Sequence, residues 1–245
     1  MAKIQEVKNK NYNGFEKCFN KGIVSEIMQA GHTTTIRCGN ELEKIIIDKC
    51  RKKIVIKDLK HFISNINRFS NGVYICPKTA KNFKNYFDHH HPDFIVFIKK
   101  NSKITCFITE LKDGFQFDTK KVPGEIANLK ECCNLLRPAL PKGIKISYRI
   151  CCFAAPTKED IVIGCKNRIK INNVITGEDF CKELGVRMQS IIKIREADAK
   201  YNQNYVIDKI LNSNETKNYF AQHPEILVSL MKTPKIKKAL VNLSV

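Results

Sequence analysis

The sequence predicts an α/β fold, with a mixed central sheet flanked by helices and a helical C-terminal part. Residues 94–98 and 103–112 are rich in Ile, Val and Phe and are separated by a short polar stretch, which is typical of a β-hairpin. Segments with apolar residues every three or four positions, typical of amphipathic helices, come before and after this hairpin. Strand-like segments give way to helical ones near residue 177, so we expect a core domain over residues 1–177 and a helical region over residues 178–245 packed on the same domain.

The composition supports a real core and indicates a polyanionic partner. With 245 residues and 43% hydrophobic content, the chain can bury a sizeable core without disulfide staples. The formal net charge is +19, and lysines that neutralise phosphates provide sequence-independent affinity for nucleic acid. The alternative explanation of the charge is a genome biased towards Lys, Ile and Asn.

The cysteines and the N-terminus indicate an intracellular protein. Eleven cysteines, an odd number, include several in apolar segments, and no Cys-x-x-Cys motif occurs, so we expect reduced core thiols rather than disulfides or a zinc ribbon. The first six residues lack the apolar run of a signal peptide, and no segment approaches the ~20 apolar residues of a membrane span. We therefore expect a cytoplasmic protein without a membrane partner.

Before the hairpin, the sequence predicts two helices separated by a break. Apolar residues recur every four positions over residues 15–27, and Gly31 follows as a stop signal. The cluster Thr33-Thr34-Thr35 then offers an N-terminal cap for a second helix over residues 36–52. Residues 1–13 are polar and are expected to form a loose arm.

A third helix, a strand and a loop are expected next. Asp58 is suited to cap the helix, Ser70-Asn71-Gly72 ends it, and residues 73–76 follow as a short strand. Residues 77–87 then form a short helix or loop with a lysine at every third position: Lys78, Lys81 and Lys84. This spacing places the lysines along one face, where they either contact phosphate or face solvent.

The hairpin brings charged residues together at one end of the sheet. In its second strand, a period of two places Glu110 and Lys112 at the end of an otherwise apolar face. Asp93 opens the partner strand, and a short loop brings it close to Glu110 and Lys112. A charged hairpin end at the surface is the alternative, but apolar strands that lead into all three charges favour a functional site.

After the hairpin, the sequence predicts a helix and two further strands. Pro123 suits the first turn of a helix that Pro138 ends, and residues 144–155 alternate in polarity as a strand does. Residues 161–163 are expected to form another short strand. The segment behind it carries three alternating cations on one face: Lys166, Arg168 and Lys170. Such a ribbon is suited to follow a phosphate backbone, although a sheet edge guarded by charge has the same pattern.

Helical patterns dominate the rest of the chain. Thr176 begins a helix-capping sequence, and residues 188–210 fit one long helix or two broken ones. Pro224 and Pro234 each suit the start of a short helix. We expect this region to serve dimerisation, DNA contact or both.

The charged hairpin end has the chemistry of a metal-dependent phosphodiesterase. Mg²⁺ prefers oxygen ligands, commonly one or two carboxylates with water and substrate phosphate, and Asp93 and Glu110 can supply the carboxylates. Lys112 on the same strand face can offset phosphate charge and orient an attacking water or help to deprotonate it. His89, His90 and His91 could contact phosphate or metal, but three consecutive side chains point in different directions, which favours a solvated loop. Further polar residues lie just beyond the motif, and their spacing selects none of them: Asp113, Gln116 and Asp118.

Pro92-Asp93 and, after a hairpin, Glu110-Leu111-Lys112 resemble the motif of the PD-(D/E)XK nuclease superfamily. This superfamily includes many type II restriction endonucleases and several repair and resolvase enzymes. The expected order of elements over about residues 36–155 is similar to the α-β-β-β-α-β core of the family. The resemblance therefore extends beyond the short motif.

The resemblance implies roles for individual residues. Asp93, Glu110 and the main-chain carbonyl of Leu111 would bind Mg²⁺, for which Mn²⁺ is expected to substitute. In many members the first core helix adds an acid after a glycine, a position that Glu43 matches here. Glu41 is the alternative, because one sequence does not fix the helix phase. Glu43 would bind a second metal ion or its water, unless it is an ordinary surface acid.

Within this superfamily we expect a type II restriction endonuclease that cuts both strands of double-stranded DNA at a short specific sequence, because the residues outside the core are enough for base-reading and dimer-forming elements. The resemblance implies 5′-phosphate and 3′-hydroxyl products and a homodimer, since two symmetry-related sites suit a symmetric target. Two alternatives are a repair or recombination nuclease that recognises DNA structure and a DNA-binding protein whose nuclease-like site is not used. The complete set of Asp, Glu and Lys argues against the second alternative.

Overall fold

The computed structural model describes residues 2–6, 14–101, 103–115 and 120–231. It confirms the predicted fold class, an α/β fold with a mixed sheet flanked by helices and a helical C-terminal part. The described residues divide into two compact units, one of residues 38–194 and one of the residues before 38 and after 194. The divisions fall within two long helices, α2 (Ile23–Lys49) and α7 (Met188–Asn212). The predicted domain boundary at residue 177 stays a prediction.

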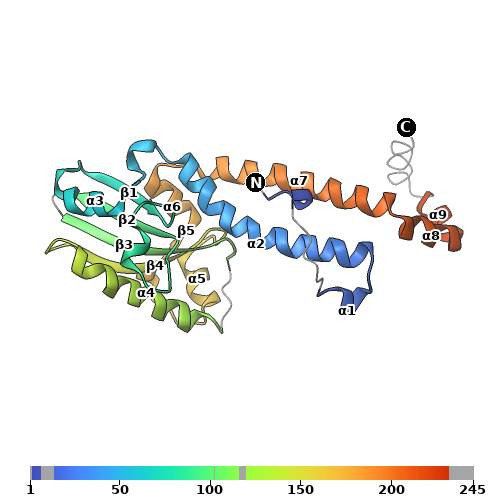
Figure 1. The fold of residues 1–245 in the computed structure, drawn as a ribbon, viewed down its shortest axis with the longest axis horizontal. Coiled ribbons are helices and arrows are strands. Elements are labelled where there is room, and N and C mark those ends of the chain that lie inside the picture. The colour runs from blue at the N-terminus through green and yellow to red at the C-terminus, as the bar shows by residue number, and fades with distance from the viewer. Residues whose placement is uncertain (1, 7–13, 102, 116–119, 232–245) are drawn as a thin grey trace. The chain divides into compact units, whose positions relative to one another are not determined.

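The central sheet has five strands in the order β1-β2-β3-β4-β5 (Figure 1). β1 (Gly72–Pro77), β2 (Phe94–Lys100) and β3 (Lys103–Lys112) are antiparallel neighbours, so the predicted hairpin is confirmed. β4 (Lys145–Cys152) and β5 (Val174–Thr176) join in parallel. Parallel neighbours need crossover connections, which contain helices here.

Helices cover both faces of the sheet in the unit of residues 38–194. On one face, buried strand residues such as Cys106 and Ile108 share a core with three helices, α3 (Leu59–Asn65), α4 (Val122–Leu136) and α5 (Lys158–Gly164). On the other face, residues such as Leu111 pack with α6 (Gly177–Leu184) and the C-terminal part of α2. This division follows the alternation of side chains along each strand.

The predicted break between the first two helices is wrong. A short helix, α1 (Glu16–Phe19), comes first, and α2 then runs without interruption through Gly31 and Thr33-Thr34-Thr35. Each threonine hydroxyl donates a hydrogen bond of 2.7–3.0 Å to the carbonyl four residues earlier. The threonines therefore satisfy their hydroxyls inside the helix and do not need to cap a new one.

The strand predicted at residues 161–163 is also wrong, because these residues belong to α5. Thr157 caps that helix and accepts a 3.1 Å hydrogen bond from the main-chain N–H of Asp160. The segment behind it is not an extended ribbon, since Lys166 and Asn167 have positive φ angles of 51° and 57°. Local capping thus outweighs the strand preference of the Ile-Val-Ile run.

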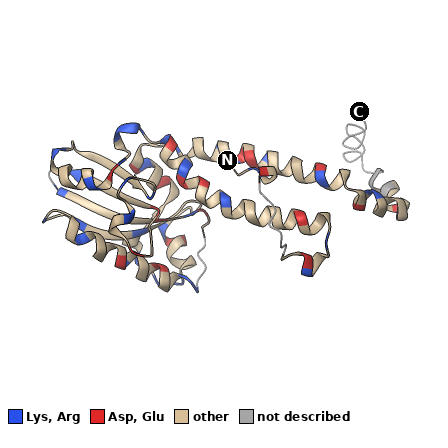
Figure 2. Cartoon of the chain, viewed as in Figure 1, with Lys and Arg blue, Asp and Glu red and all other residues tan. Residues whose placement is uncertain are grey.

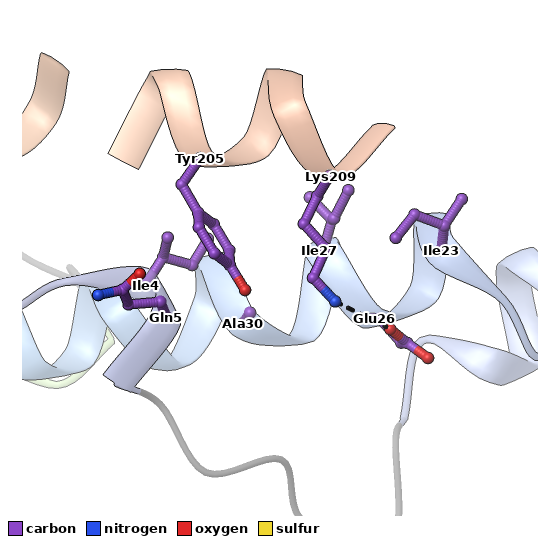
Figure 3. A pocket seen from close by; sticks show the side chains of 8 residues that line it. All are labelled: Ile4, Gln5, Ile23, Glu26, Ile27, Ala30, Tyr205 and Lys209. Atoms are coloured by element: carbon purple, nitrogen blue, oxygen red, sulfur yellow. Dashed lines mark ion pairs between the residues drawn. The ribbon is translucent and has the colours of Figure 1, made fainter. Parts of the chain in front are cut away.

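The described residues of the predicted N-terminal arm are anchored rather than loose. Ile4–Glu6 form a 3₁₀ turn with Ile4 buried, and Asn202 of α7 hydrogen-bonds to the main chain of Ala2 and Ile4 at 3.0 and 2.9 Å. Figure 3 shows a small pocket in the unit formed by the residues before 38 and after 194. Beside it, Lys209 Nζ of α7 lies 4.0 Å from Glu26 Oε2 of α2. Residues 7–13 of the predicted arm lie outside the described residues.

Other predicted elements are confirmed. Asp58 and Thr176 cap α3 and α6 through hydrogen bonds of 3.0 and 3.1 Å, and residues 188–210 form one continuous helix. α8 (Asn214–Gln222) and α9 (Pro224–Met231) follow, and Pro224 begins α9 as predicted. The helix predicted from Pro234 lies outside the described residues.

Most cysteines are core residues, as the sequence predicted. All eleven lie in the described part of the chain, none of them is in a disulfide, and most are buried. Within that part, no helix has the length and apolar character needed to cross a bilayer.

Candidate active site

The end of the β2–β3 hairpin brings Asp93 and Glu110 together. Asp93 directly precedes β2, and the register pairs Phe94 with Thr109, so Asp93 lies opposite Glu110. The Asp93 side chain is buried, and its Oδ2 accepts a 2.8 Å hydrogen bond from the main-chain N–H of Leu111. The structure therefore places the two acids side by side, where the sequence predicted them.

The main-chain carbonyl of Leu111 faces the same side as Asp93. In an extended strand, the N–H and C=O of one residue point towards the same neighbouring strand, and the Leu111 N–H points to Asp93. The next carbonyl, that of Lys112, points the other way and accepts a 2.7 Å hydrogen bond from Phe153. Two carboxylates and one carbonyl thus lie at the same end of the sheet.

Helix α2 supplies a third acid, and a lysine joins it to Asp93. Lys78 directly follows β1, and its Nζ lies 2.7 Å from Glu43 Oε1 and 3.1 Å from Asp93 Oδ1. The acid side chains are only 15% and 12% exposed, whereas that of Lys78 is 37% exposed. Glu43 is therefore an acid that the first core helix brings to the site. Lys78, predicted from its spacing as a phosphate contact, lies between two of the site's acids.

In the described part of the chain, Lys112 contacts the carboxylate of Glu110 and that of a fourth acid, Glu125. Its Nζ lies 2.7 Å from Glu110 Oε1 and 3.2 Å from Glu125 Oε1. Glu125 belongs to the first turn of α4 and was missed by the sequence reasoning. The available signal was an acid two residues after Pro123, but acids are favoured in any first helical turn because of the helix dipole. Only the contact with Lys112 distinguishes Glu125 from such an acid.

Burial and mutual repulsion raise the pKa of both glutamates that lie near Asp93. Burial is the larger cause for Glu110, and the charge of Asp93 adds to it, so the pKa is about 7 despite the neighbouring Lys112. The same two causes raise the pKa of Glu43 to about 7 despite Lys78. The two lysines therefore do not fully offset the effects of burial and of the neighbouring carboxylates on Glu43 and Glu110.

The two lysines keep their charge at neutral pH. Burial lowers the pKa of Lys112, but the charges and hydrogen bonds of Glu110 and Glu125 outweigh it and raise the pKa. Burial also opposes protonation of Lys78, and its contacts with Glu43 and Asp93 likewise raise its pKa. Lys112 is accordingly suited to contact a phosphate oxygen or orient a water, and not to accept a proton in this state.

The donor set fits a divalent cation. Carboxylate and carbonyl oxygens are the ligands that Mg²⁺ prefers, and Asp93, Glu110 and the Leu111 carbonyl offer them at one end of the sheet. Among the described residues, no three His, Cys, Asp or Glu side chains form a complete metal-binding group. The ammonium groups of Lys78 and Lys112 lie among these acids and contact Glu43, Asp93 and Glu110.

A comparison with known proteins identifies the relationship. The chain is 31% identical over 218 residues to the type II restriction enzyme HhaII of Haemophilus parahaemolyticus, a match that covers 86% of this chain and 93% of that enzyme. The chain belongs to the family of this restriction enzyme. No protein-family model matches the chain, and no solved structure matches it at a significant level. The relationship thus rests on nearly the full length of the relative and not on a short motif.

In this member of the restriction-enzyme family, basic residues lie close to the acids. Lys78, Lys84 and His91 line one hollow of 710 Å³, and Lys78 also lines a second hollow of 380 Å³ with Glu43 and Lys44. Figure 2 shows Lys and Arg on many of the elements around the sheet.

The other candidate cations do not line these hollows. Lys81 is exposed on the same loop as Lys78 and lines neither hollow. Three exposed residues between α5 and β5 line neither hollow as well: Lys166, Arg168 and Lys170. Gln116 and Asp118 lie outside the described residues. The structure therefore brings Lys78 and Lys84, but not the second predicted cation cluster, to the hollows beside the acids.

Proposed function

We propose that this chain is a Mg²⁺-dependent type II restriction endonuclease that hydrolyses phosphodiester bonds in double-stranded DNA at a short specific sequence, with an active site of the PD-(D/E)XK type. The observation that carries the proposal is the convergence of Asp93, Glu110 and Lys112 at one hairpin end. Similarity to a type II restriction enzyme supports restriction over DNA repair and over DNA binding without cleavage.

Each site residue has a role in this proposal. Asp93, Glu110 and the Leu111 carbonyl would hold Mg²⁺, or Mn²⁺ in its place, and Glu43 would take part through its position beside Asp93. The ion, when bound, supplies Lewis-acid polarisation of the scissile phosphate. Lys112 donates to a phosphate oxygen and orients the attacking water in line with the bond to be broken. The hydrogen bond from Leu111 fixes the Asp93 carboxylate in one orientation.

The surface supplies affinity for DNA. Lys78, Lys81 and Lys84 on the loop after β1, together with the net charge of +19, suit contacts with the phosphate backbone. Three cations between α5 and β5 are further candidate contacts: Lys166, Arg168 and Lys170. We also propose a homodimer, because two identical sites related by a two-fold axis match the two strands of a symmetric DNA sequence.

Cleavage assays test the proposal. The purified protein should nick or linearise plasmid DNA in Mg²⁺ and not in chelator. Asp93→Ala and Lys112→Ala should each lower the cleavage rate at least about a hundredfold, while salt-sensitive DNA binding persists. Lys103→Ala, at the exposed opposite end of β3, is the matched control and should cut normally. Unchanged cutting by both site variants would show that the site is misassigned.

The ends of the cut DNA distinguish the kinds of nuclease. Sequencing should reveal one short sequence at every end, with a 5′-phosphate and a 3′-hydroxyl group. A preference for junctions or flaps without a common sequence would instead indicate a repair or recombination nuclease. Binding without cleavage in both Mg²⁺ and Mn²⁺ would indicate a DNA-binding protein that does not use the site.

A further inference from the structure

One ammonium group lies between two acids of the candidate active site that come from different elements. Lys78 Nζ lies 2.7 Å from Glu43 of α2 and 3.1 Å from Asp93, and both distances are those of charge-assisted hydrogen bonds. The two acid side chains are largely buried, whereas Lys78 is more than twice as exposed. The lysine thus reaches from a solvent-accessible position into a carboxylate pair.

We propose that Lys78 is a positioning residue that stands in for the divalent cation: it holds Glu43 and Asp93 together in the metal-free protein and moves to a DNA phosphate when the cation binds. This inference rests on the proposed nuclease function and adds to it a coupling between metal binding and DNA binding. The sequence predicted Lys78 only as a phosphate contact, and its spacing gave no sign of a link to metal binding.

The charge balance explains why a stand-in is needed. Glu43, Asp93 and Glu110 gather at one end of the sheet, where DNA phosphates would have to approach. Without a compensating cation, these carboxylates repel each other and repel DNA. Lys78 supplies that compensation before a metal ion arrives, so the site can be held in shape without metal.

The surroundings of Lys78 provide the second position. Lys78 lines the 710 Å³ hollow together with Lys84, His91 and Asn85, side chains that suit a phosphate group. A lysine has a flexible four-carbon stem and a compact point charge, so its ammonium can leave one anion for another without moving the main chain. A cation bound by Asp93 takes over the charge compensation, and Lys78 then becomes available to the hollow.

DNA binding with and without a divalent ion tests this coupling. The binding of a labelled duplex to Lys78→Met is measured by fluorescence anisotropy, once in chelator and once in saturating Ca²⁺, which serves as a probe cation. Lys78→Met should lose about tenfold or more affinity in chelator and no more than about threefold in Ca²⁺. Lys84→Met is the matched control from the same hollow and should lose the same factor in both conditions. Lys78→Arg keeps the charge and should restore binding in chelator.

The Ca²⁺ affinity of the free protein, measured by calorimetry, gives an independent readout. Removal of the competing ammonium should tighten Ca²⁺ binding several-fold in Lys78→Met, whereas Lys84→Met should bind Ca²⁺ as the wild type does.

A second measurement needs no variant. Saturating Ca²⁺ should increase the labelling of Lys78 by an amine-reactive reagent, detected by mass spectrometry, and should leave the labelling of Lys84 unchanged.

The outcomes separate this inference from the proposed function. An equal loss of DNA affinity in chelator and in Ca²⁺ for Lys78→Met would overturn the stand-in role and leave Lys78 as a simple phosphate contact. If Lys78→Met does not fold, the labelling of the wild type decides, and Lys78 reactivity that does not change with Ca²⁺ overturns the inference. A wild-type protein that neither binds nor cuts DNA would overturn the proposed function together with the inference.

Discussion

Raising the pH in the presence of a chelator is expected to destabilise the protein through Glu110. Its pKa is about 7 in the folded chain because the side chain is buried and lies near Asp93, whereas an exposed glutamate in an unfolded chain titrates near 4.3. Below pH ~4.3 both states hold the proton, and the folded state has no disadvantage. Between about pH 4.3 and 7 the unfolded chain releases a proton that the folded chain keeps, so the free energy of unfolding falls as the pH rises.

The size of the effect follows from the difference between the two pKa values. Each unit corresponds to 1.36 kcal/mol, so a carboxyl raised to about 7 costs on the order of 3 kcal/mol of stability once the pH exceeds 7. The charges facing Glu110 set this value: Asp93 and Glu125 raise the pKa, and Lys112 opposes them. A loss of this size is a substantial part of the 5–15 kcal/mol that stabilises a typical domain.

The assay compares the wild type with Glu110→Gln by denaturant unfolding between pH 5 and 8 in chelator. The difference between the two proteins removes the contribution of groups that lie away from Glu110, such as exposed histidines, because they titrate in both. The variant should be more stable than the wild type by about 1 kcal/mol at pH 5, where the unfolded glutamate is already largely ionised, and by up to ~3 kcal/mol at pH 8, where the folded carboxylate is ionised too. Saturating Mg²⁺ should reduce the difference by stabilising the carboxylate. A difference that is the same at pH 5 and pH 8 would refute the reasoning.

Three more substitutions test individual contacts. Glu125→Gln removes one of the two acids at Lys112 and should lower kcat about tenfold with little change in KM, so an unchanged kcat in steady-state cleavage of a duplex would contradict its positioning role. Glu183→Ala removes the carboxylate that accepts two hydrogen bonds, of 2.9 and 2.6 Å, from the buried Arg149 guanidinium, while the 3.1 Å bond to Thr109 stays; the loss should cost about 3–5 kcal/mol in urea unfolding. Thr157→Ala removes the cap of α5 and should cost about 1 kcal/mol in the same assay, with the fold retained in circular dichroism.

Patterns that arise along one element were predictable from the sequence. The hairpin follows from strand periodicity, and its register alone brings Asp93 to Glu110. Where two local signals compete, the sequence does not decide between them. The threonine cluster in α2 can either cap a helix or bond back within one, and the β-branched run in α5 is helical because Thr157 caps it. Continuity of the surrounding helix decided the first case, and the cap decided the second.

Contacts between distant elements were beyond sequence reasoning. Lys78 and Glu43 are 35 positions apart and meet only because α2 packs against the sheet, so neither spacing nor composition indicates their ion pair. The same holds for Glu125 of α4 and Lys112 of β3, whose Oε1 and Nζ atoms lie 3.2 Å apart. The sequence could therefore indicate which residues have suitable chemistry, but not how their charges are paired.

In the proposed enzyme, the residues expected to provide affinity for DNA differ from those expected to carry out cleavage. The chain as a whole carries a net charge of +19, yet the described residues of its candidate site include four acids that contact two lysines. Long-range attraction to DNA is therefore expected from the rest of the surface, while the site, whose acids Lys78 and Lys112 compensate in the metal-free protein, would gain further positive charge from a bound cation. Substitutions among the site acids should change the metal dependence of cleavage and leave the salt dependence of DNA binding nearly unchanged. Removal of surface lysines should instead reduce that salt dependence by about one unit of slope for each lost phosphate contact, with the metal dependence intact.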